Sequence, residues 1–340
     1  MSLVNTQCRL AARPVGLPAS SDWDIVDVDA PAPGDGEILV EVQYLSIDPG
    51  MRGWMNPGST YMPGVEIAEV MRALAIGRIV ASRHLDFVDG DVVSGMFGVQ
   101  RYALSTGAGV TKLDTSLAPA PAYLGVLGIS GLTAYFGLLE IGRLMPGETV
   151  LVSGAAGSVG SVVGQIAKAK GCQAIGIAGG QDKCRWLVDE VGFDAAIDYK
   201  SEVVQRKLRE TCPNGIDVFF DNVGGEILDA ALANLARKAR VAICGAVSQY
   251  NSTTPVQGPK NYMMLLVARA RMEGFLVFDY ADRYAEAARE MLRWIKEGKL
   301  ASREHVEEGI DQFPSTLLKL FSGENFGKLL LKVGADPSKN

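Results

Sequence analysis

The sequence predicts an α/β protein, with a doubly wound parallel sheet and a smaller antiparallel or barrel-like β domain. Three observations support this fold class. The chain has 340 residues, which is more than one ordinary hydrophobic core accommodates and indicates two domains. Short strand-like runs alternate with Pro- and Gly-containing turns up to about residue 125. Beyond it, strand-like and helix-like segments alternate, as in a parallel sheet with helices on both faces.

The first domain is built from the strand-like runs EILVEVQYLSI, GRIVAS and DVVSGMFG. The end of the chain, from about Ala301, contains the helix-like PSTLLKLFSG and the strand-like KLLLKV. We expect this segment to return to the first domain. The predicted domains are therefore residues 1–125 with 301–340, and residues 126–300.

The second domain opens with PGETVLVSG, a turn and strand, and SVGSVVGQIAKAKG, a helix. The segments that follow alternate in type: CQAIGIAG (strand), DKCRWLVDEVG (helix), AAIDY (strand), SEVVQRKLRETC (helix), IDVFFDNVGG (strand), EILDAALANLA (helix) and ARVAICGAV (strand). The strands are nearly all apolar, as expected of strands buried on both faces.

Composition restricts the class of protein. Apolar residues make up 48% and charged residues 21% of the chain, as in soluble globular proteins, and the net charge of −6 argues against a nucleic-acid partner. The N-terminal segment lacks an apolar leader, and the apolar run YMMLLVA is far shorter than the roughly 20 residues that span a bilayer. We expect a cytoplasmic protein with no membrane partner.

Metal and disulfide chemistry are not expected. The five cysteines (Cys8, Cys172, Cys184, Cys212 and Cys244) form no CxxC pair, which fits a reducing compartment. The two histidines, His84 and His305, have no nearby Cys or His partner in sequence. A structural zinc cluster is thereby excluded, and a catalytic zinc lacks ligands.

A glycine-rich turn lies between the first strand and helix of the second domain, in LVSGAAGSVGSVVGQIAKAKG. Gly154, Gly157 and Gly160 have the spacing GxxGxxG, with Ala155 where the common GxGxxG fingerprint has its first glycine. Small residues let the backbone approach a pyrophosphate, and the helix N-terminus supplies N–H groups. The alternative is that these residues serve only tight packing of strand on helix.

The end of the second strand indicates which dinucleotide is bound. An NAD site usually has an acidic residue there for the ribose 2′-OH, but this strand ends in Gly179 and Gly180. Lys183 and Arg185 follow, which suits a 2′-phosphate and therefore NADPH. Asp182 keeps NAD open, and the alternative for the two cations is that they are solvated helix residues.

A series of motifs in order covers nearly the whole chain: SIDPGMRGWM, YMPGVEIAEV, AAGSVGSVVGQIAK, GGQDKC, FFDNVGG, CGAVSQY, ARMEGFLVFDY and ENFGK. Together they resemble the zinc-independent medium-chain dehydrogenases/reductases, in particular the leukotriene 12-hydroxydehydrogenase/prostaglandin reductase group with its bacterial curcumin reductase-like enzymes. The resemblance implies a Rossmann domain, a GroES-like β-barrel-type catalytic domain and a homodimer. Zinc alcohol dehydrogenases would have a metal-binding cysteine near Ser46, where this chain reads YLSIDPG.

The resemblance also implies site residues. It places Ser158, Val159, Gly160 and Ser161 at the pyrophosphate, Gly180, Lys183 and Tyr199 at the adenosine end with its 2′-phosphate, and Asn222 along the cofactor. Around the nicotinamide it places Cys244, Gly245, Ala246, Ser248, Tyr250, Phe275, Leu276, Val277 and Asn325. For Asn222 and Asn325 the alternative is turn or cap chemistry. The chain departs from the group at Gly50, often aromatic, and at Ala68, commonly Gly.

Without a metal, reduction of a bare carbonyl lacks its usual electrophile, whereas reduction of a conjugated carbon–carbon double bond needs only a donor to the enolate oxygen. The resemblance makes Tyr250 the first candidate for this donor. Tyr61 is a weaker candidate, for lining the substrate cleft. The predicted function is NADPH-dependent reduction of an enone or enal. The alternatives are a quinone oxidoreductase and a protein that binds NADPH without catalysis.

Overall fold

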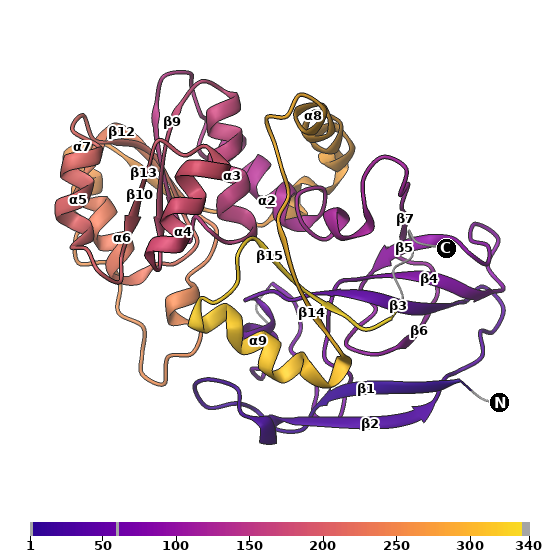
Figure 1. Cartoon of the computed structure of the whole chain (residues 1–340). Helices are drawn as coiled ribbons and strands as arrows, with labels where there is room; N and C mark the ends of the chain where they lie inside the picture. Colours follow the sequence, from indigo (N-terminus) through magenta and orange to yellow (C-terminus); the bar gives the residue numbers. More distant parts are fainter. Residues whose placement is uncertain (1–2, 59–60, 335–340) are drawn as a thin grey trace. The chain divides into compact units, whose positions relative to one another are not determined.

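The computed structural model describes residues 3–58 and 61–334, and the chain divides into two compact units (Figure 1). Unit 1 comprises residues 1–124 and 304–340, and unit 2 comprises residues 125–303. Each unit has its own sheet and its own apolar core.

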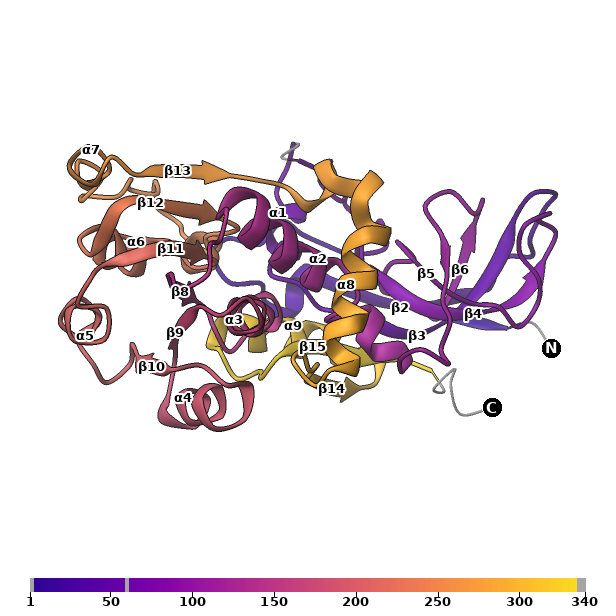
Figure 2. The ribbon, with the colours of Figure 1, turned by 90° about the horizontal axis from the view of Figure 1, so that it is seen from above.

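Unit 2 contains a six-stranded parallel sheet, which confirms the predicted fold class. Its strands are β8 (Thr149–Ser153), β9 (Gln173–Ala178), β10 (Ala195–Asp198), β11 (Ile216–Asp221), β12 (Leu235–Ile243) and β13 (Arg271–Gly274). They lie in the order β10-β9-β8-β11-β12-β13, which can be followed in Figure 2. The chain order reverses between β8 and β11. In open parallel sheets, ligands bind beyond the carboxyl ends of the strands at such a reversal.

Helices cover both faces of this sheet. They are α2 (Ile129–Phe136), α3 (Ser158–Ala169), α4 (Gln181–Trp186), α5 (Val204–Thr211), α6 (Gly225–Leu232) and α7 (Met264–Ala268), while α8 (Tyr284–Lys296) packs against α2. Figure 2 shows α5 and α6 on one side of the strands and α2 and α3 on the other. Leu151, Ile175 and Phe219 are fully buried between the layers, as their apolar runs predict. Strand β13 was missed in the sequence because its residues are largely exposed and two of the four are charged.

Unit 1 is dominated by antiparallel strands. These are β1 (Val4–Leu10), β2 (Trp23–Asp29), β3 (Ile38–Ser46), β4 (Ala75–Ser82), β5 (Val92–Gly95), β6 (Tyr102–Ser105) and β7 (Thr111–Lys112), with β14 (Glu304–Glu308), β15 (Lys328–Lys332) and the helices α1 (Met51–Trp54) and α9 (Phe313–Ser322) from both ends of the chain. Strands β1 and β2 form a separate hairpin. Strand β15 pairs antiparallel with β3, so the C-terminal segment adds to the sheet of the N-terminal part.

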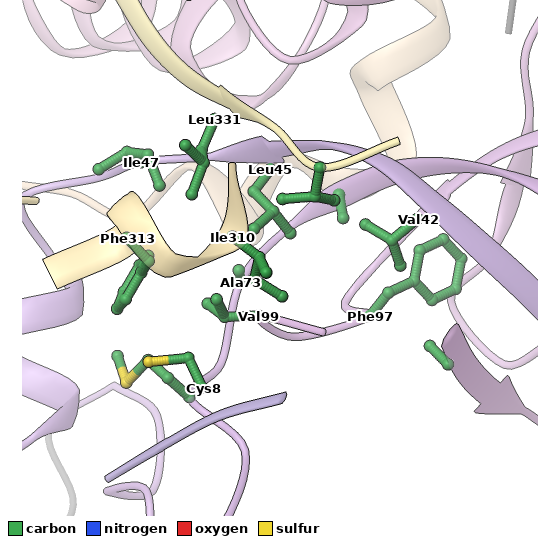
Figure 3. Packing of buried hydrophobic residues seen from close by; sticks show 14 of the residues in the cluster. Cys8, Val42, Leu45, Ile47, Ala73, Phe97, Val99, Ile310, Phe313 and Leu331 are labelled. Carbon is green, nitrogen blue, oxygen red and sulfur yellow. The ribbon is translucent and has the colours of Figure 1, made fainter. Parts of the chain in front are cut away.

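The core of unit 1 joins residues far apart in sequence (Figure 3). Phe313 and Ile310 of the C-terminal segment pack in one cluster with Cys8 and Val99. The Phe313 ring lies edge-on to the ring of Trp23, with centroids 5.1 Å apart. Burial raises the pKa of the Cys8 thiol to about 12, so this cysteine is a protonated core residue at neutral pH. The early and late parts of unit 1 therefore share one core.

Within the described ranges, no helix has both the length and the apolar character needed to cross a bilayer.

A single helical glycine tests the packing of α3. An added Cβ at Gly164 would overlap the ring of Phe193. Although alanine favours a helix over glycine by about 1 kcal/mol, we expect Gly164→Ala to destabilise the protein by about 1–3 kcal/mol through overpacking. Urea denaturation would measure this change. Gly53 of α1 has open space at the same position, so Gly53→Ala is the matched control and should be neutral or mildly stabilising. Unchanged stability in Gly164→Ala would contradict the packing described.

Candidate active site

The turn between β8 and α3 has the geometry of a phosphate cradle. Gly154 adopts a φ of +58°, which glycine reaches without a steric penalty. An added Cβ at Gly160 would overlap the backbone of Gly154 and Ala155, so this close approach requires glycine. Gly157 precedes α3 and has no side-chain oxygen to cap the first-turn N–H groups. The residues therefore fit a pyrophosphate at the helix N-terminus.

A buried pair of side chains joins β8 to β11 at the reversal of strand order. The Ser153 hydroxyl donates to the carboxylate of Asp221 at 2.6 Å, and both side chains are almost fully buried. The backbone N–H groups of Val223 and Gly224 also donate to this carboxylate, at 3.0 and 3.1 Å. Burial raises the pKa of Asp221, and these hydrogen bonds act against the rise.

Asn222 follows this pair and is held by it. Its backbone N–H donates to the Ser153 hydroxyl at 2.8 Å, and its side-chain amide donates to the Ser153 carbonyl at 2.7 Å. The side chain thus bridges two strand ends. Such a structural hydrogen bond is the alternative that the sequence analysis gave for Asn222. Contact of Asn222 with a cofactor stays a prediction.

The segment Cys244–Tyr250 lies over the same strand ends. The backbone N–H groups of Cys244 and Gly245 donate to the carbonyl of Asp221 at 2.8 and 3.1 Å, and the Ser248 hydroxyl donates to the carbonyl of Val223 at 2.6 Å. Burial, and then the charge of Asp221, raise the pKa of the Cys244 thiol to about 12. Cys244 is therefore protonated at neutral pH and is unsuited to be a nucleophile.

Tyr250 folds back over this segment. The backbone N–H of Ala246 donates to the Tyr250 hydroxyl oxygen at 3.3 Å. An added Cβ at Gly245 would lie 2.9 Å from that oxygen, so the position of the phenol requires glycine there. A phenol that accepts one hydrogen bond can still donate its own proton. Tyr250 thus has the chemistry of a hydrogen-bond donor at the carboxyl edge of the sheet.

The end of β9 carries a glycine in place of an acidic side chain. An added Cβ at Gly179 would lie 2.9 Å from the ring and hydroxyl of Tyr199 and 3.0 Å from Cε of Lys200. Lys183 of α4 is partly buried, and burial followed by the charge of Lys200 lowers its pKa to about 8. This corner therefore presents a tyrosine and two lysines, which are donors that suit a phosphate.

The two cations that follow the second strand take different positions. Arg185 is exposed and forms an ion pair with Asp182 on α4. It is therefore the solvated helix residue that the alternative described. Lys183 is the more buried of the two.

Other predicted residues have structural contacts of their own. The Phe275 ring packs against Phe220 with centroids 6.1 Å apart, Leu276 is partly exposed and Val277 is buried. In unit 1, the side-chain amide of the buried Asn325 donates to the carbonyl of Gly327 at 3.1 Å, which is turn chemistry.

Unit 2 thus brings together the following predicted residues at the carboxyl edge of its sheet: Ser158, Val159, Gly160, Ser161, Gly180, Lys183, Tyr199, Asn222, Cys244, Gly245, Ala246, Ser248 and Tyr250. Tyr61 and Asn325 belong to unit 1.

The two departures from the family pattern both have structural consequences in unit 1. An added Cβ at Gly50 would lie 2.9 Å from the hydroxyl of Tyr61, so an aromatic side chain at position 50 would displace that tyrosine. Ala68 adopts a φ of +69°, a left-handed conformation that favours glycine. The chain therefore carries backbone strain at a position where the group commonly has glycine.

Sequence reasoning missed the residues that support the site. Asp198 and Asp221 each end a buried strand, and each carboxylate accepts backbone N–H groups from the turn beyond a strand. An acidic residue as the last member of an apolar strand, in AAID and IDVFFD, was the available signal. Within the described residues, no group of His, Cys, Asp and Glu is arranged to hold a metal ion.

Two parts of the chain match known protein families. Residues 6–113 match the family described as the N-terminal domain of oxidoreductase, and residues 158–297 match the family described as zinc-binding dehydrogenase. Together with the sheet order and the glycine turn, these matches define a dehydrogenase/reductase of the medium-chain class.

Similar proteins narrow this class. The NADPH-dependent curcumin reductase of Escherichia coli (strain K12) is 41% identical over 337 residues, 98% of this chain and 98% of that protein. The NADP(+)-dependent 2-alkenal reductase of Nicotiana tabacum is 38% identical over 338 residues, again 98% of each. The crystal structure of CurA in complex with NADPH from Vibrio vulnificus is 42% identical, with a TM-score of 0.92 over 97% of this chain and 99% of that one.

The chain belongs to the zinc-independent medium-chain dehydrogenase/reductase family, in the group that includes curcumin reductase, prostaglandin reductase 1 and 2-alkenal reductase. The resemblance stated from the sequence motifs is thereby confirmed.

The glycine turn yields a paired prediction. We expect Gly160→Ala to displace the turn backbone, which would lower stability by about 1–3 kcal/mol and weaken NADPH binding about tenfold or more. At Gly157 an added Cβ would lie 3.2 Å from a single carbonyl oxygen, that of Gly154, so Gly157→Ala is the milder control. Fluorescence titration and thermal unfolding would measure both. Equal NADPH affinity in the two variants would contradict the proposed cradle.

Proposed function

We propose that the protein reduces the carbon–carbon double bond of α,β-unsaturated ketones and aldehydes with NADPH. The observation that carries the proposal is the Tyr250 phenol, held by the Ala246 N–H at the carboxyl edge of the unit 2 sheet. The names of the relatives, which include a curcumin reductase and a 2-alkenal reductase, support the same reaction class.

NADPH is the cofactor that the strand ends support. Gly179 has no carboxylate of the kind typical of NAD sites, Tyr199 lies against it, and Lys183 lies on α4, which follows it. The first-turn N–H groups of α3 would hold the pyrophosphate. When bound, NADPH would supply a hydride for the β-carbon of the substrate, and a proton from water or a tyrosine would complete the reduction at the α-carbon.

Tyr250 has the role of stabilising the negative charge that develops on the substrate carbonyl oxygen. A phenol hydroxyl can donate a hydrogen bond to the enolate oxygen without losing its proton. The Ala246 N–H bonded to the phenol oxygen strengthens that donor, because it favours negative charge on the oxygen. Tyr61, a residue of unit 1, is the weaker candidate for contact with the substrate.

The reaction makes a specific prediction for product and variant. Deuteride from labelled NADPH should appear on the β-carbon of a saturated ketone. Tyr250→Phe should lower kcat by about 10- to 1000-fold, because one donor to the enolate oxygen is lost while the ring remains. Mass and NMR analysis of the product, with steady-state kinetics, would measure both.

Tyr102→Phe is the control for this experiment, because that hydroxyl lies in unit 1 and donates a hydrogen bond to the Glu41 carboxylate. Deuterium on the carbinol carbon of an allylic alcohol would overturn the proposal. Turnover of quinones alone would favour the quinone oxidoreductase, and NADPH binding without turnover of any acceptor would favour a binding protein.

A homodimer through β13 is the assembly that we propose. This strand lies at the edge of the sheet, beside exposed apolar side chains. These are Tyr262, Met263, Leu266, Val267, Met272, Leu276 and Phe278. Two copies of β13 paired antiparallel about Met272 would set Arg271 of each opposite Glu273 of the other.

Sedimentation velocity tests this arrangement. We expect a dimer for the native protein and a shift toward monomer for Glu273→Arg, because like charges would then face one another across the pair. Glu226→Arg changes an exposed acid on α6 and is the control. A monomeric native protein would refute the dimer.

We also infer a cytoplasmic location, since the five cysteines of the structure are all free. Cell fractionation that recovered the protein outside the cytoplasm would contradict this inference.

A further inference from the structure

The carboxyl ends of β9 and β10 form a corner at which three consecutive residues, Asp198, Tyr199 and Lys200, face the end of β9. Ala178 is the register partner of Asp198, and the backbone N–H of Tyr199 donates to the carbonyl of Ala178 at 3.1 Å. The stem of Lys200 and the ring of Tyr199 both lie against Gly179. Lys200 therefore lies at the same place as the tyrosine of the proposed 2′-phosphate site.

Asp198 holds this corner together. Its buried carboxylate accepts the N–H of Gly180 at 2.7 Å, the N–H of Lys200 at 3.0 Å and the hydroxyl of Ser201 at 2.8 Å. These bonds and the charge of Lys200 hold its pKa below the usual range despite burial. The bonds link the turn after β9 to the turn after β10.

We propose that Lys200 is a second cation for the 2′-phosphate of NADPH, and that Asp198 is the positioning residue that fixes Lys200 and Tyr199 against Gly179. This inference rests on the proposed use of NADPH. Lys200, which follows β10, would then determine the preference for NADPH over NADH together with Lys183, which follows β9.

The charges around Lys183 fit a site for an anion. Lys183 and Lys200 repel each other, and a phosphate dianion between them would remove that repulsion. Two acids of the neighbouring segments have partners of their own. Glu202 accepts the N–H of Asp198 at 2.9 Å and pairs with Lys207 at 3.4 Å, while Asp182 pairs with Arg185.

The other groups at the corner do not supply a positive charge. Burial, with the charges of Asp198 and Glu202, raises the pKa of the Cys184 thiol to about 11, so it is neutral at pH 7. Tyr199 is a phenol. The two lysines are therefore the cations that this corner offers to a dianion.

Calorimetric titration with NADPH, NADH, 2′,5′-ADP and 5′-AMP tests the proposal. We expect Lys200→Ala to weaken NADPH and 2′,5′-ADP by about 3- to 15-fold, as for a partly exposed charge-assisted contact, and to leave NADH and 5′-AMP within about twofold. Arg185→Ala removes an exposed cation of α4 and is the matched control. It should change neither the preference for NADPH over NADH nor the preference for 2′,5′-ADP over 5′-AMP.

Asp198→Asn distinguishes positioning from mere structure. It keeps the shape of the side chain and removes the charge that accepts the three donors. We expect the ratio of NADH to NADPH dissociation constants to fall by about 3-fold or more. Equal weakening of both cofactors would mean that Asp198 supports the fold alone.

The pH dependence gives an independent readout. Lys183, with a pKa of about 8 in the ligand-free protein, loses its charge as pH rises through that value, so NADPH affinity should fall from about pH 7 to about pH 10 while NADH affinity does not. In Lys200→Ala the repulsion is gone, the pKa of Lys183 rises and the fall should begin at a higher pH. An unchanged profile would contradict the coupling of the two lysines.

The failures of the two proposals are distinguishable. If the native protein bound NADPH and NADH equally, the use of NADPH itself would be wrong. If the native protein preferred NADPH and Lys183→Ala lost that preference while Lys200→Ala retained it in full, only the role of Lys200 would be overturned.

Discussion

The hydrogen bond between Ser153 and Asp221 is the constraint on which the unit 2 site depends. It joins the ends of β8 and β11, where the order of the strands reverses and where parallel sheets bind their ligands. The glycine turn departs from Ser153, and Asn222 and the turn after β11 depart from Asp221. The segment from Cys244 donates to the carbonyl of Asp221. The proposed pyrophosphate cradle and the loop that holds Tyr250 thus have one common anchor.

This anchor explains why a charged residue is retained in an apolar layer. A buried carboxylate without donors would cost several kcal/mol. At Asp221 the hydroxyl of Ser153 and two backbone N–H groups of the following turn donate hydrogen bonds that offset this cost. The carboxylate in turn supplies an acceptor to those two N–H groups. The carboxylate therefore shapes the turn as much as the turn stabilises the carboxylate.

The sequence was most informative for strands that are buried on both faces of the sheet. Strands such as VFF of β11 are apolar throughout because helices cover both faces, and that pattern is visible without a structure. Edge strand β13 and the β1–β2 hairpin lack this pattern, because each has a face exposed to water. The glycine turn was recognisable from spacing. Lys200 was not, because its position at Gly179 depends on the register between β9 and β10, and register is a property of pairing rather than of one segment.

The two aspartates at strand ends have pKa values that shift in opposite directions. Both are almost fully buried, and both accept N–H groups from a turn. The pKa of Asp198 is lowered because its hydrogen bonds from Gly180, Ser201 and Lys200, together with the charge of Lys200, outweigh its burial, whereas the pKa of Asp221 is raised because burial outweighs its donors. By linkage, ionised Asp198 contributes stability that is present above its unfolded pKa and is lost as pH falls through its folded value. For Asp221 the sign is opposite, since its folded pKa lies above the unfolded one and ionisation costs stability as pH rises through that interval. Ionised Asp221 thus lowers the stability of the fold at the reversal of strand order. Ionised Asp198 raises it at the corner that also contains Lys183 and Lys200.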